Sequence, residues 1–266
     1  MVIYSHSRLS TYEQCPMKFK FKYLDKIPVE IEDTIECFMG RKVHEALEWF
    51  YKKIIIGEVP KLKDVLEQYE CSWFKDFNKE IKIVKKEFSS EDYFIKGHYF
   101  ISKYYEKNYP FENNILAIEK KILVDLNGKG EYLLRGFIDR LDYNKETKEY
   151  EIHDYKTGGW MKSQKELDKD RQLALYSLGI KQEFSDAERI LLNWHFLAFN
   201  KKMFSLRTNE ELEKLKQKTI ELIKKIEIET NWPTSKSALC DWCEFQEHCG
   251  KVQSLNLDNL SSKEDI

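Results

Sequence analysis

Hydrophobic positions divide the chain into a helical first part and a strand-rich middle. In "MGRKVHEALEWFYKKIII" (39–56) apolar side chains recur at helical intervals. Helices are also predicted at 7–25, with a break at Cys15-Pro16, and at roughly 62–85 and 92–108. Short runs rich in β-branched and aromatic residues follow, and they predict strands at 114–126, 132–143, 149–158, 189–199 and 202–208. Further helices are predicted at 163–182 and 209–229.

This order of elements predicts an α/β fold in which helices flank a mixed sheet core, with an added helical lobe. We expect a single domain over residues 1–252. It would consist of a helical N-terminal part (about 1–110), a sheet core (about 111–208) and a C-terminal helix with a cysteine segment (about 209–252). A polar tail, 253–266, ends the chain.

Composition narrows the class of protein. Of the 266 residues 42% are apolar and 34% are charged, which is typical of a globular protein and excludes a fibrous or disordered one. With 44 basic and 46 acidic residues the net charge is −2, so nucleic-acid binding would need local basic patches. No signal peptide and no apolar run of about 20 residues is found, so we expect a soluble, cytoplasmic protein without a membrane partner.

The segment "EIHDYKTG" contains the most informative polar residues. On a strand, Asp154 and Lys156 point to one face and Tyr155 to the other. The preceding strand, "GFIDRLD", should pair with it as a hairpin and bring Asp139 close, so that acids from two strands could hold one Mg²⁺. An ordinary ion pair between Asp154 and Lys156 is the alternative. Asp142 is a competing acid nearer the turn.

Two helical segments could contribute to the same site. In "GRKVHEALE", Gly40, His44 and Glu48 are four residues apart and share a helix face. His44 could complete a metal site or contact a phosphate, or could simply face solvent. In "RQLALYSLG", Gln172 and Tyr176 are also neighbours on one face, although Tyr176 could equally belong to the core.

Six segments, taken in order, resemble the PD-(D/E)XK nuclease superfamily, specifically its RecB-like branch. They extend from about residue 7 to 249 and read "SRLSTYEQCPMKFKFKY", "GRKVHEALE", "GFIDRLD", "DYKTG", "QLALY" and "CDWCEFQEHC". The resemblance implies a restriction-endonuclease-like mixed sheet flanked by helices. It also implies that Mg²⁺ or Mn²⁺ binds to His44, Asp139, Asp154 and the backbone carbonyl of Tyr155.

The same resemblance assigns roles to four more residues. Lys156 is implied to be catalytic, together with the two aspartates. Gln172 and Tyr176 are implied to hold DNA and to order the site. Glu119, in "AIEKKI", matches a position that is often acidic in relatives.

Four cysteines fit the iron–sulfur members of this branch, which include AddB-type helicase-nucleases and CRISPR adaptation exonucleases. In those members one cysteine precedes the nuclease core and three follow it, as Cys15 and then Cys240, Cys243 and Cys249 do here. The resemblance therefore implies a four-iron four-sulfur cluster that acts as a structural staple. Zinc also accepts four thiolates and stays an alternative, because spacing alone cannot separate the two. Cys37 and Cys71 are expected to be ordinary thiols.

These inferences predict a metal-dependent deoxyribonuclease, expected to be an exonuclease acting on single-stranded DNA or DNA ends. Its roles would lie in DNA repair and recombination, phage DNA processing or CRISPR adaptation, with a helicase or CRISPR integration protein as a possible partner. A catalytically silent iron–sulfur subunit that only grips DNA or a partner is the second hypothesis. A zinc-stapled protein with accidental motif matches is the third.

Overall fold

A computed structural model describes residues 2–29, 33–78, 80–111 and 114–249 of the chain. Six strands form one mixed sheet in the order β1-β3-β4-β5-β6, with β2 also paired to β3. The strands, listed in chain order, are β1 (Ile3–Tyr4), β2 (Ile115–Asp125), β3 (Leu133–Asn144), β4 (Glu149–Lys156), β5 (Ile190–Phe196) and β6 (Lys201–Ser205). The predicted α/β fold with a mixed sheet is confirmed.

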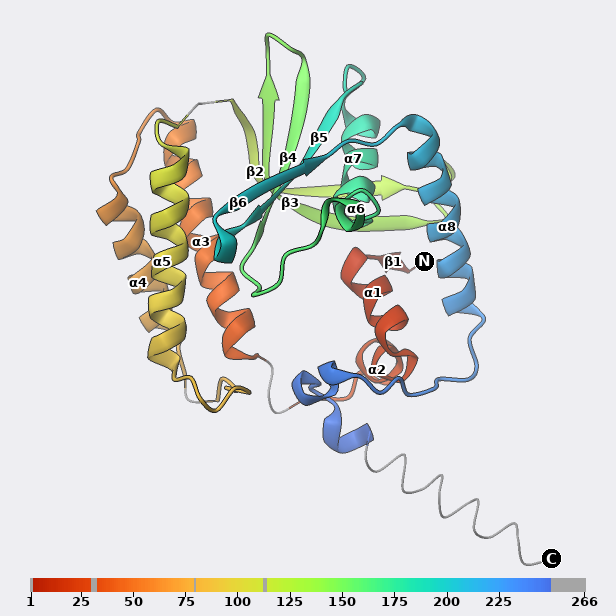
Figure 1. The fold of residues 1–266 in the computed structure, drawn as a ribbon. Helices are drawn as coiled ribbons and strands as arrows, with labels where there is room; N and C mark the ends of the chain where they lie inside the picture. The colour runs from red at the N-terminus through yellow and green to blue at the C-terminus, as the bar shows by residue number, and fades with distance from the viewer. Residues whose placement is uncertain (1, 30–32, 79, 112–113, 250–266) are drawn as a thin grey trace, which may run out of the picture.

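Helices cover both faces of this sheet (Figure 1). On one side lie α3 (Ile35–Ile55), α4 (Leu62–Asp76) and α5 (Ser90–Asn108), which form the helical lobe. On the other side lie α1 (His6–Gln14), α2 (Pro16–Phe19), α6 (Gln164–Leu167), α7 (Gln172–Glu183) and α8 (Asn209–Glu227). A π-helical turn, Lys20–Leu24, continues α2. The expected helical N-terminal part is thus divided, because α1 and α2 pack on the face opposite the lobe.

Two apolar cores hold the three layers together. One includes Leu9 and Tyr12 of α1, side chains of α7 and α8, and one face of the sheet. The other joins α3, α4 and α5 to the sheet through Tyr155 and Leu197. None of the helices in the described ranges is long and apolar enough to span a membrane.

The helix predicted over 163–182 is interrupted between α6 and α7, where side chains of the linker and of the distant Ser205 and Arg207 form hydrogen bonds. Asp168 accepts a hydrogen bond from Ser205 Oγ (2.6 Å), and Asp170 Oδ1 accepts one from the backbone N–H of Gln172 (2.9 Å). Arg207 donates to the carbonyl oxygens of Leu167 and Asp170 (2.6 and 3.2 Å). Side chains therefore satisfy the backbone groups that a continuous helix would have paired.

Two further differences from the predicted elements concern the ends of secondary structure. The helix expected over 62–85 ends at Asp76, and Lys82 instead forms a β-bridge with Thr34 at the start of α3. The two-residue strand β1, which pairs in parallel with β3, was not predicted because it is too short to show an alternating pattern. The predicted tail, 253–266, lies outside the described residues.

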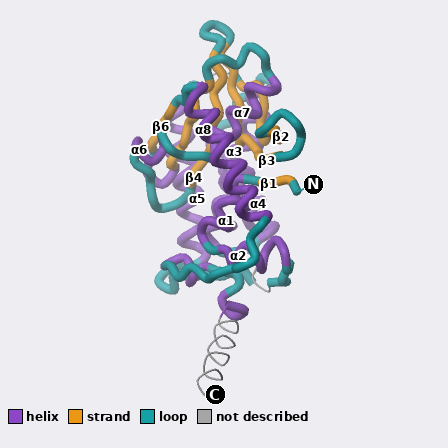
Figure 2. Tube along the Cα trace, turned by 90° about the vertical axis from the view of Figure 1, so that its right-hand side faces the viewer, coloured by secondary structure: helices purple, strands orange, loops and turns teal. Residues whose placement is uncertain are grey.

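The last described segment returns to the N-terminal helices. It contains a short 3₁₀ helix, η3 (Ala238–Trp242), and lies beside α2 at the end of the molecule away from the sheet (Figures 1 and 2). The backbone N–H of Met17 donates to the carbonyl of Pro233 (3.2 Å), and the rings of Phe19 and Trp232 stack with centroids 5.8 Å apart. The two ends of the described chain are therefore packed together.

Candidate active site

Helix α3 meets the end of strand β4 through a glycine. A Cβ at Gly40 would lie 2.9 Å from the Thr157 hydroxyl, so a larger residue would push the helix from the strand. One turn later, His44 Nε2 lies 2.7 Å from the carbonyl oxygen of Tyr155. The spacing of Gly40 and His44 therefore brings an imidazole to the backbone of β4.

Asp139 approaches the same point from β3. The antiparallel register pairs Arg140 with His153, so the next step along the hairpin places Asp139 opposite Asp154. Asp139 Oδ2 accepts a hydrogen bond from the backbone N–H of Tyr155 (2.8 Å) and lies 3.5 Å from His44 Nδ1. The predicted β3–β4 hairpin is confirmed, and it brings Asp139 to the histidine.

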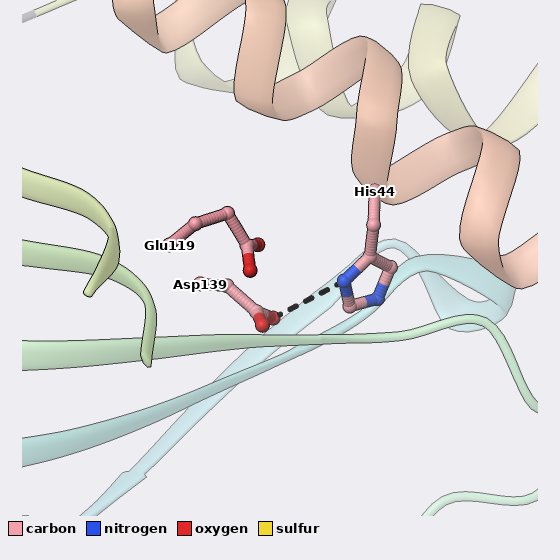
Figure 3. Close-up of side chains that lie close together, drawn as sticks. All are labelled: His44, Glu119 and Asp139. Carbon is pink, nitrogen blue, oxygen red and sulfur yellow. Dashed lines mark ion pairs between the residues drawn. The ribbon is translucent and has the colours of Figure 1, made fainter. Parts of the chain in front are cut away.

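Glu119 completes a group of three possible metal ligands. Ligand atoms of His44, Glu119 and Asp139 all lie within 4.8 Å of one another, and they come from α3, β2 and β3 (Figure 3). Glu119 has a φ of +48°, in the left-handed region, and the β2–β3 register is irregular just before it. A strained glutamate beside a histidine and an aspartate is the kind of exception that occurs at functional sites.

Asp154 lies outside that group and forms a second, adjoining one. Its Oδ2 is 2.7 Å from Lys156 Nζ, and its Oδ1 accepts a hydrogen bond from Gln172 Nε2 (3.1 Å). Lys156 Nζ also donates to Gln172 Oε1 (2.9 Å). The first residue of α7 thus fixes both members of the acid–lysine pair.

Tyr176 lies one turn along α7 and contacts the sheet at Gly136. Burial raises the pKa of its hydroxyl, and the Gln172 side chain opposes this effect. A Cβ at Gly136 would lie 2.2 Å from Tyr176 Cε1, so only glycine fits under this ring. Tyr176 belongs to the core, which is one of the two alternatives that the sequence left open, and its role beside Gln172 stays a prediction.

Electrostatics distinguishes these groups from ordinary surface residues. Burial lowers the pKa of His44, but the carboxylates of Asp139 and Asp154 outweigh it and raise the pKa to about 9. Burial, followed by the charges of Asp139 and Glu48, raises the pKa of Glu119 to about 7. Crowded carboxylates of this kind are what a divalent cation would neutralise.

The acid–lysine pair is shifted as well. Burial raises the pKa of Asp154, and the Lys156 charge opposes this effect. Burial lowers the pKa of Lys156, but Asp154 outweighs it, so the net shift is upward and the ammonium stays charged. Lys156 therefore keeps a positive charge next to the cluster of acids.

Sequence reasoning missed a buried polar network behind the site. Arg140 is 7% exposed, and its Nη1 donates to the hydroxyl groups of Tyr104 (3.1 Å) and Tyr155 (3.2 Å). Its Nη2 lies 3.0 Å from His153 Nδ1, and its Nε pairs with Asp142 (3.0 Å). Asp142 is thus a partner of Arg140 and lies on the opposite side of the hairpin from Lys156. The sequence signal that could have predicted this network is Arg140 itself, because an arginine within an otherwise apolar strand is buried only when it is paired.

The four cysteines expected to hold a cluster line one cavity of about 70 Å³. The sulfur of Cys15 accepts a hydrogen bond from the backbone N–H of Lys18 (3.5 Å), and that of Cys240 accepts one from Ser237 (3.4 Å). Burial raises the pKa of Cys243. Cys37 and Cys71 are exposed and lie on α3 and α4, away from this cavity.

The lysines of "KFKFKY" take part in this arrangement. Glu244, within the cysteine segment, pairs with Lys18 (2.8 Å) and Lys22 (2.9 Å). Phe19 and Phe21 are buried, so the stretch packs against the cysteine segment with its aromatic residues inward.

The chain was compared with known proteins. The profile of the PD-(D/E)XK nuclease superfamily matches residues 3–250. No curated protein matches significantly. A crystal structure of a protein from Eubacterium rectale, named "Putative exonuclease", superposes with a TM-score of 0.54 at 11% identity, covering 90% of this chain and 86% of that one. The crystal structure of SSO0001 gives a TM-score of 0.38 at 14% identity, covering 79% and 92%, which is too low to support an argument.

The family match and the geometry agree. The matched range includes every residue of the two adjoining groups, from His44 on α3 to Tyr176 on α7. The structural neighbour supports the fold alone, because its sequence identity is low. The chain belongs to the PD-(D/E)XK nuclease superfamily.

Proposed function

We propose that this protein is a RecB-like, metal-dependent deoxyribonuclease that hydrolyses phosphodiester bonds. The observation that carries the proposal is the convergence of His44, Glu119 and Asp139 beside the Asp154–Lys156 pair. Histidine and carboxylate oxygens suit Mg²⁺ or Mn²⁺, and the lysine adjoins them.

The residues divide the work as follows. His44, Asp139, Asp154 and the carbonyl of Tyr155 would hold the cation, with Glu119 as a further acidic ligand. When bound, a divalent cation supplies Lewis acidity at the phosphate and lowers the pKa of a water. Lys156 stabilises negative charge that develops on the phosphoryl oxygens. Gln172 keeps Lys156 and Asp154 in place, and Tyr176 in turn supports Gln172.

Lys156→Ala tests the nuclease proposal directly. We expect cleavage of labelled single-stranded DNA in Mn²⁺ to fall by about 10²–10³-fold, since one preorganised charge is removed from the transition state. Binding of the same DNA should survive. Lys121→Ala, which removes an exposed lysine from β2, is the control and should cleave normally.

A catalytically silent subunit is the competing function. Wild-type protein that binds DNA but leaves it intact in both Mg²⁺ and Mn²⁺ would establish that reading and exclude the nuclease. The grouping of His44, Glu119 and Asp139 beside the charged Lys156 argues against a silent subunit.

We also propose that Cys15, Cys240, Cys243 and Cys249 hold a four-iron four-sulfur cluster. All four line one cavity, and backbone N–H groups donate to two of the sulfurs, which favours thiolate. Zinc, which also accepts four thiolates, is the alternative occupant. Anaerobic purification with iron, sulfide and zinc assays separates the two: a colourless protein with one zinc contradicts the cluster.

We propose that DNA ends are the substrate. The support is the printed name of the structural neighbour, "Putative exonuclease", together with the RecB-like motifs. A degradation time course on single-stranded and double-stranded DNA labelled at the 5′ or at the 3′ end tests this, because an exonuclease that starts at the labelled end releases the label at once, and circular single-stranded DNA should stay intact. A helicase or a CRISPR integration protein as partner, in repair, recombination or CRISPR adaptation, is part of the same proposal. Co-purification with the products of neighbouring genes would test it.

A further inference from the structure

A groove with a cationic lining lies between α1, α6 and α8, next to the acid–lysine pair. It has a volume of about 690 Å³. Five of the side chains that line it are cationic, namely Lys162, Lys165, Lys169, Arg171 and Lys218. Figure 1 shows that α1, α6 and α8 lie together on the side of the sheet opposite the helical lobe. We call this feature the α1–α6–α8 groove.

The acids in the groove are already engaged by other groups. Asp170 pairs with Lys162, and Glu13 pairs with Arg171 (2.6 Å). Glu166 accepts hydrogen bonds from the backbone and the hydroxyl of Ser163 (2.8 and 2.7 Å). Five cations against three acids leave a surplus of two positive charges in a chain whose net charge is −2.

With Lys162 and Arg171 paired, three exposed lysines, Lys165, Lys169 and Lys218, remain against Glu166, which gives the surplus of two. No ion pair is recorded for any of them within the described ranges, and they come from α6, the loop after it and α8. Ammonium groups converging from separate elements on one groove suit a row of phosphates better than a single carboxylate.

Two buried nitrogen atoms on the wall add donors to the groove. His6 Nδ1 and Arg171 Nε have no hydrogen-bond partner among the described residues. Burial and the charge of Arg171 lower the pKa of His6 to about 4, so the ring is neutral at pH 7. Because His6 Nε2 lies 3.3 Å from the Ser10 hydroxyl, it can accept that proton and leave Nδ1–H to donate.

Residues that line the groove are neighbours in sequence of residues in the proposed active site. Arg171 immediately precedes Gln172, which bonds to both Lys156 and Asp154. The loop that joins Lys156 to Lys162 also contains Trp160, whose side chain is 64% exposed. An exposed indole between the two sites offers a face on which a base can stack.

We propose that the α1–α6–α8 groove binds the sugar-phosphate backbone of a DNA single strand that leads away from the cleavage site, with Trp160 stacking on a base between them. This rests on the proposed nuclease function and specifies the path of its substrate. The lysines contact phosphates without reading bases, so binding is independent of sequence and sensitive to salt.

The experiment compares two triple charge reversals. The test variant is Lys165→Glu/Lys169→Glu/Lys218→Glu. The control is Lys121→Glu/Lys129→Glu/Lys145→Glu, which makes the same charge change at exposed lysines around the β2–β3–β4 hairpins. Binding of a labelled oligothymidylate is measured in a Lys156→Ala background without added divalent cation, so that hydrolysis does not disturb the measurement.

We expect the test variant to bind at least about tenfold more weakly than the control at 100 mM salt. The slope of log affinity against log salt should become shallower by about 2, because three contacts at roughly 0.7 each are lost. With Lys156 restored, KM for the oligonucleotide should rise in the test variant. Hydrolysis of bis(p-nitrophenyl) phosphate should stay unchanged, because this small diester cannot extend from the active site into the groove. Trp160→Ala should weaken binding at least about fivefold without altering the salt slope.

Equal affinities and equal salt slopes for the two triple variants would overturn the proposed strand path. Failure of the nuclease proposal looks different: wild-type protein would then hydrolyse neither the oligonucleotide nor the small diester, whereas the binding comparison could still be made.

Discussion

At the scale of single residues, the decisive question is which carboxylates hold the cation. The sequence placed Asp154 with His44 and Asp139, whereas the structure groups Glu119 most closely with them and engages Asp154 with Lys156 and Gln172. His44 lies between the carbonyl of Tyr155 and the carboxylate of Asp139. A histidine ligates only when neutral, so cation binding must displace a proton from this ring.

Glu119→Gln tests whether this residue belongs to the metal site. We expect the Mn²⁺ concentration for half-maximal activity to rise about 10–100-fold, since the change removes one negative charge among the ligands. Glu146→Gln, an exposed acid in the β3–β4 turn, is the matched control. An unchanged Mn²⁺ requirement in Glu119→Gln would place Glu119 outside the metal site.

His6 gives a prediction for stability against pH. Its pKa is about 4 in the folded chain and about 6.5 when unfolded, because burial and then Arg171 disfavour the charged ring. The unfolded chain therefore binds the extra proton, so the stabilisation is complete above pH 6.5 and is lost as pH falls from 6.5 towards 4. His6→Gln should reduce the loss of unfolding free energy between pH 7.5 and 4.5 by about 1–2 kcal/mol in urea titrations. Parallel curves for wild type and His6→Gln would refute the assignment.

At the scale of elements, the active site depends on how closely helices approach the sheet. The α7 helix can lie over β3 only because Gly136 leaves room for Tyr176. The opposite face of the hairpin is held by Arg140 and Tyr155, which tie β3 and β4 to Tyr104 of α5. The strands that carry Asp139, Asp154 and Lys156 are thus fixed from both sides of the sheet.

Gly136→Ala tests this close approach. Its Cβ would lie 2.2 Å from a ring atom of Tyr176, so the ring or the helix must move, at a cost of about 1–3 kcal/mol in unfolding free energy. Because Tyr176 supports Gln172, activity should fall as well. Gly158→Ala, at a position with open space around it, should have little effect on stability. Full activity and stability in Gly136→Ala would show that the contact is unimportant.

The same elements show how far sequence reasoning reaches. Alternating and helical patterns located the long helices and all strands except β1. Motif order proposed the acids and Lys156 as site residues, and their roles stay predictions. Patterns could not foresee the break before α7, because it depends on Arg207, which is distant in sequence. Nor could they show that Glu119 lies close to His44 and Asp139, because its position depends on a left-handed backbone conformation at that residue.

At the scale of the whole molecule, the cysteine cavity joins the two ends of the described chain. The ends are also joined by contacts that need no metal: Tyr12 donates to Glu229 (2.7 Å), and Glu244 pairs with Lys18 and Lys22. None of the cysteines that line the cavity lies near His44 or Lys156 in the chain, and the two sites share no residue. A cluster held by these cysteines, as proposed, should therefore act on stability more than on chemistry.

Cys15→Ala tests this separation of roles. Losing a link between residues 15 and 240 should cost about 4–5 kcal/mol by analogy with a disulfide closing a loop of that size. For a chain of this length that corresponds to a fall of roughly 10 °C in Tm. Bound iron should also be lost, while Cys37→Ala and Cys71→Ala, which alter exposed thiols, should keep both iron and Tm.

Below its Tm the Cys15→Ala protein should still hydrolyse bis(p-nitrophenyl) phosphate at the wild-type rate, because His44, Asp139 and Lys156 are held by α3, β3 and β4 and not by the cysteine segment. Loss of this hydrolysis in a protein that remains folded would mean that the cluster takes part in shaping the active site.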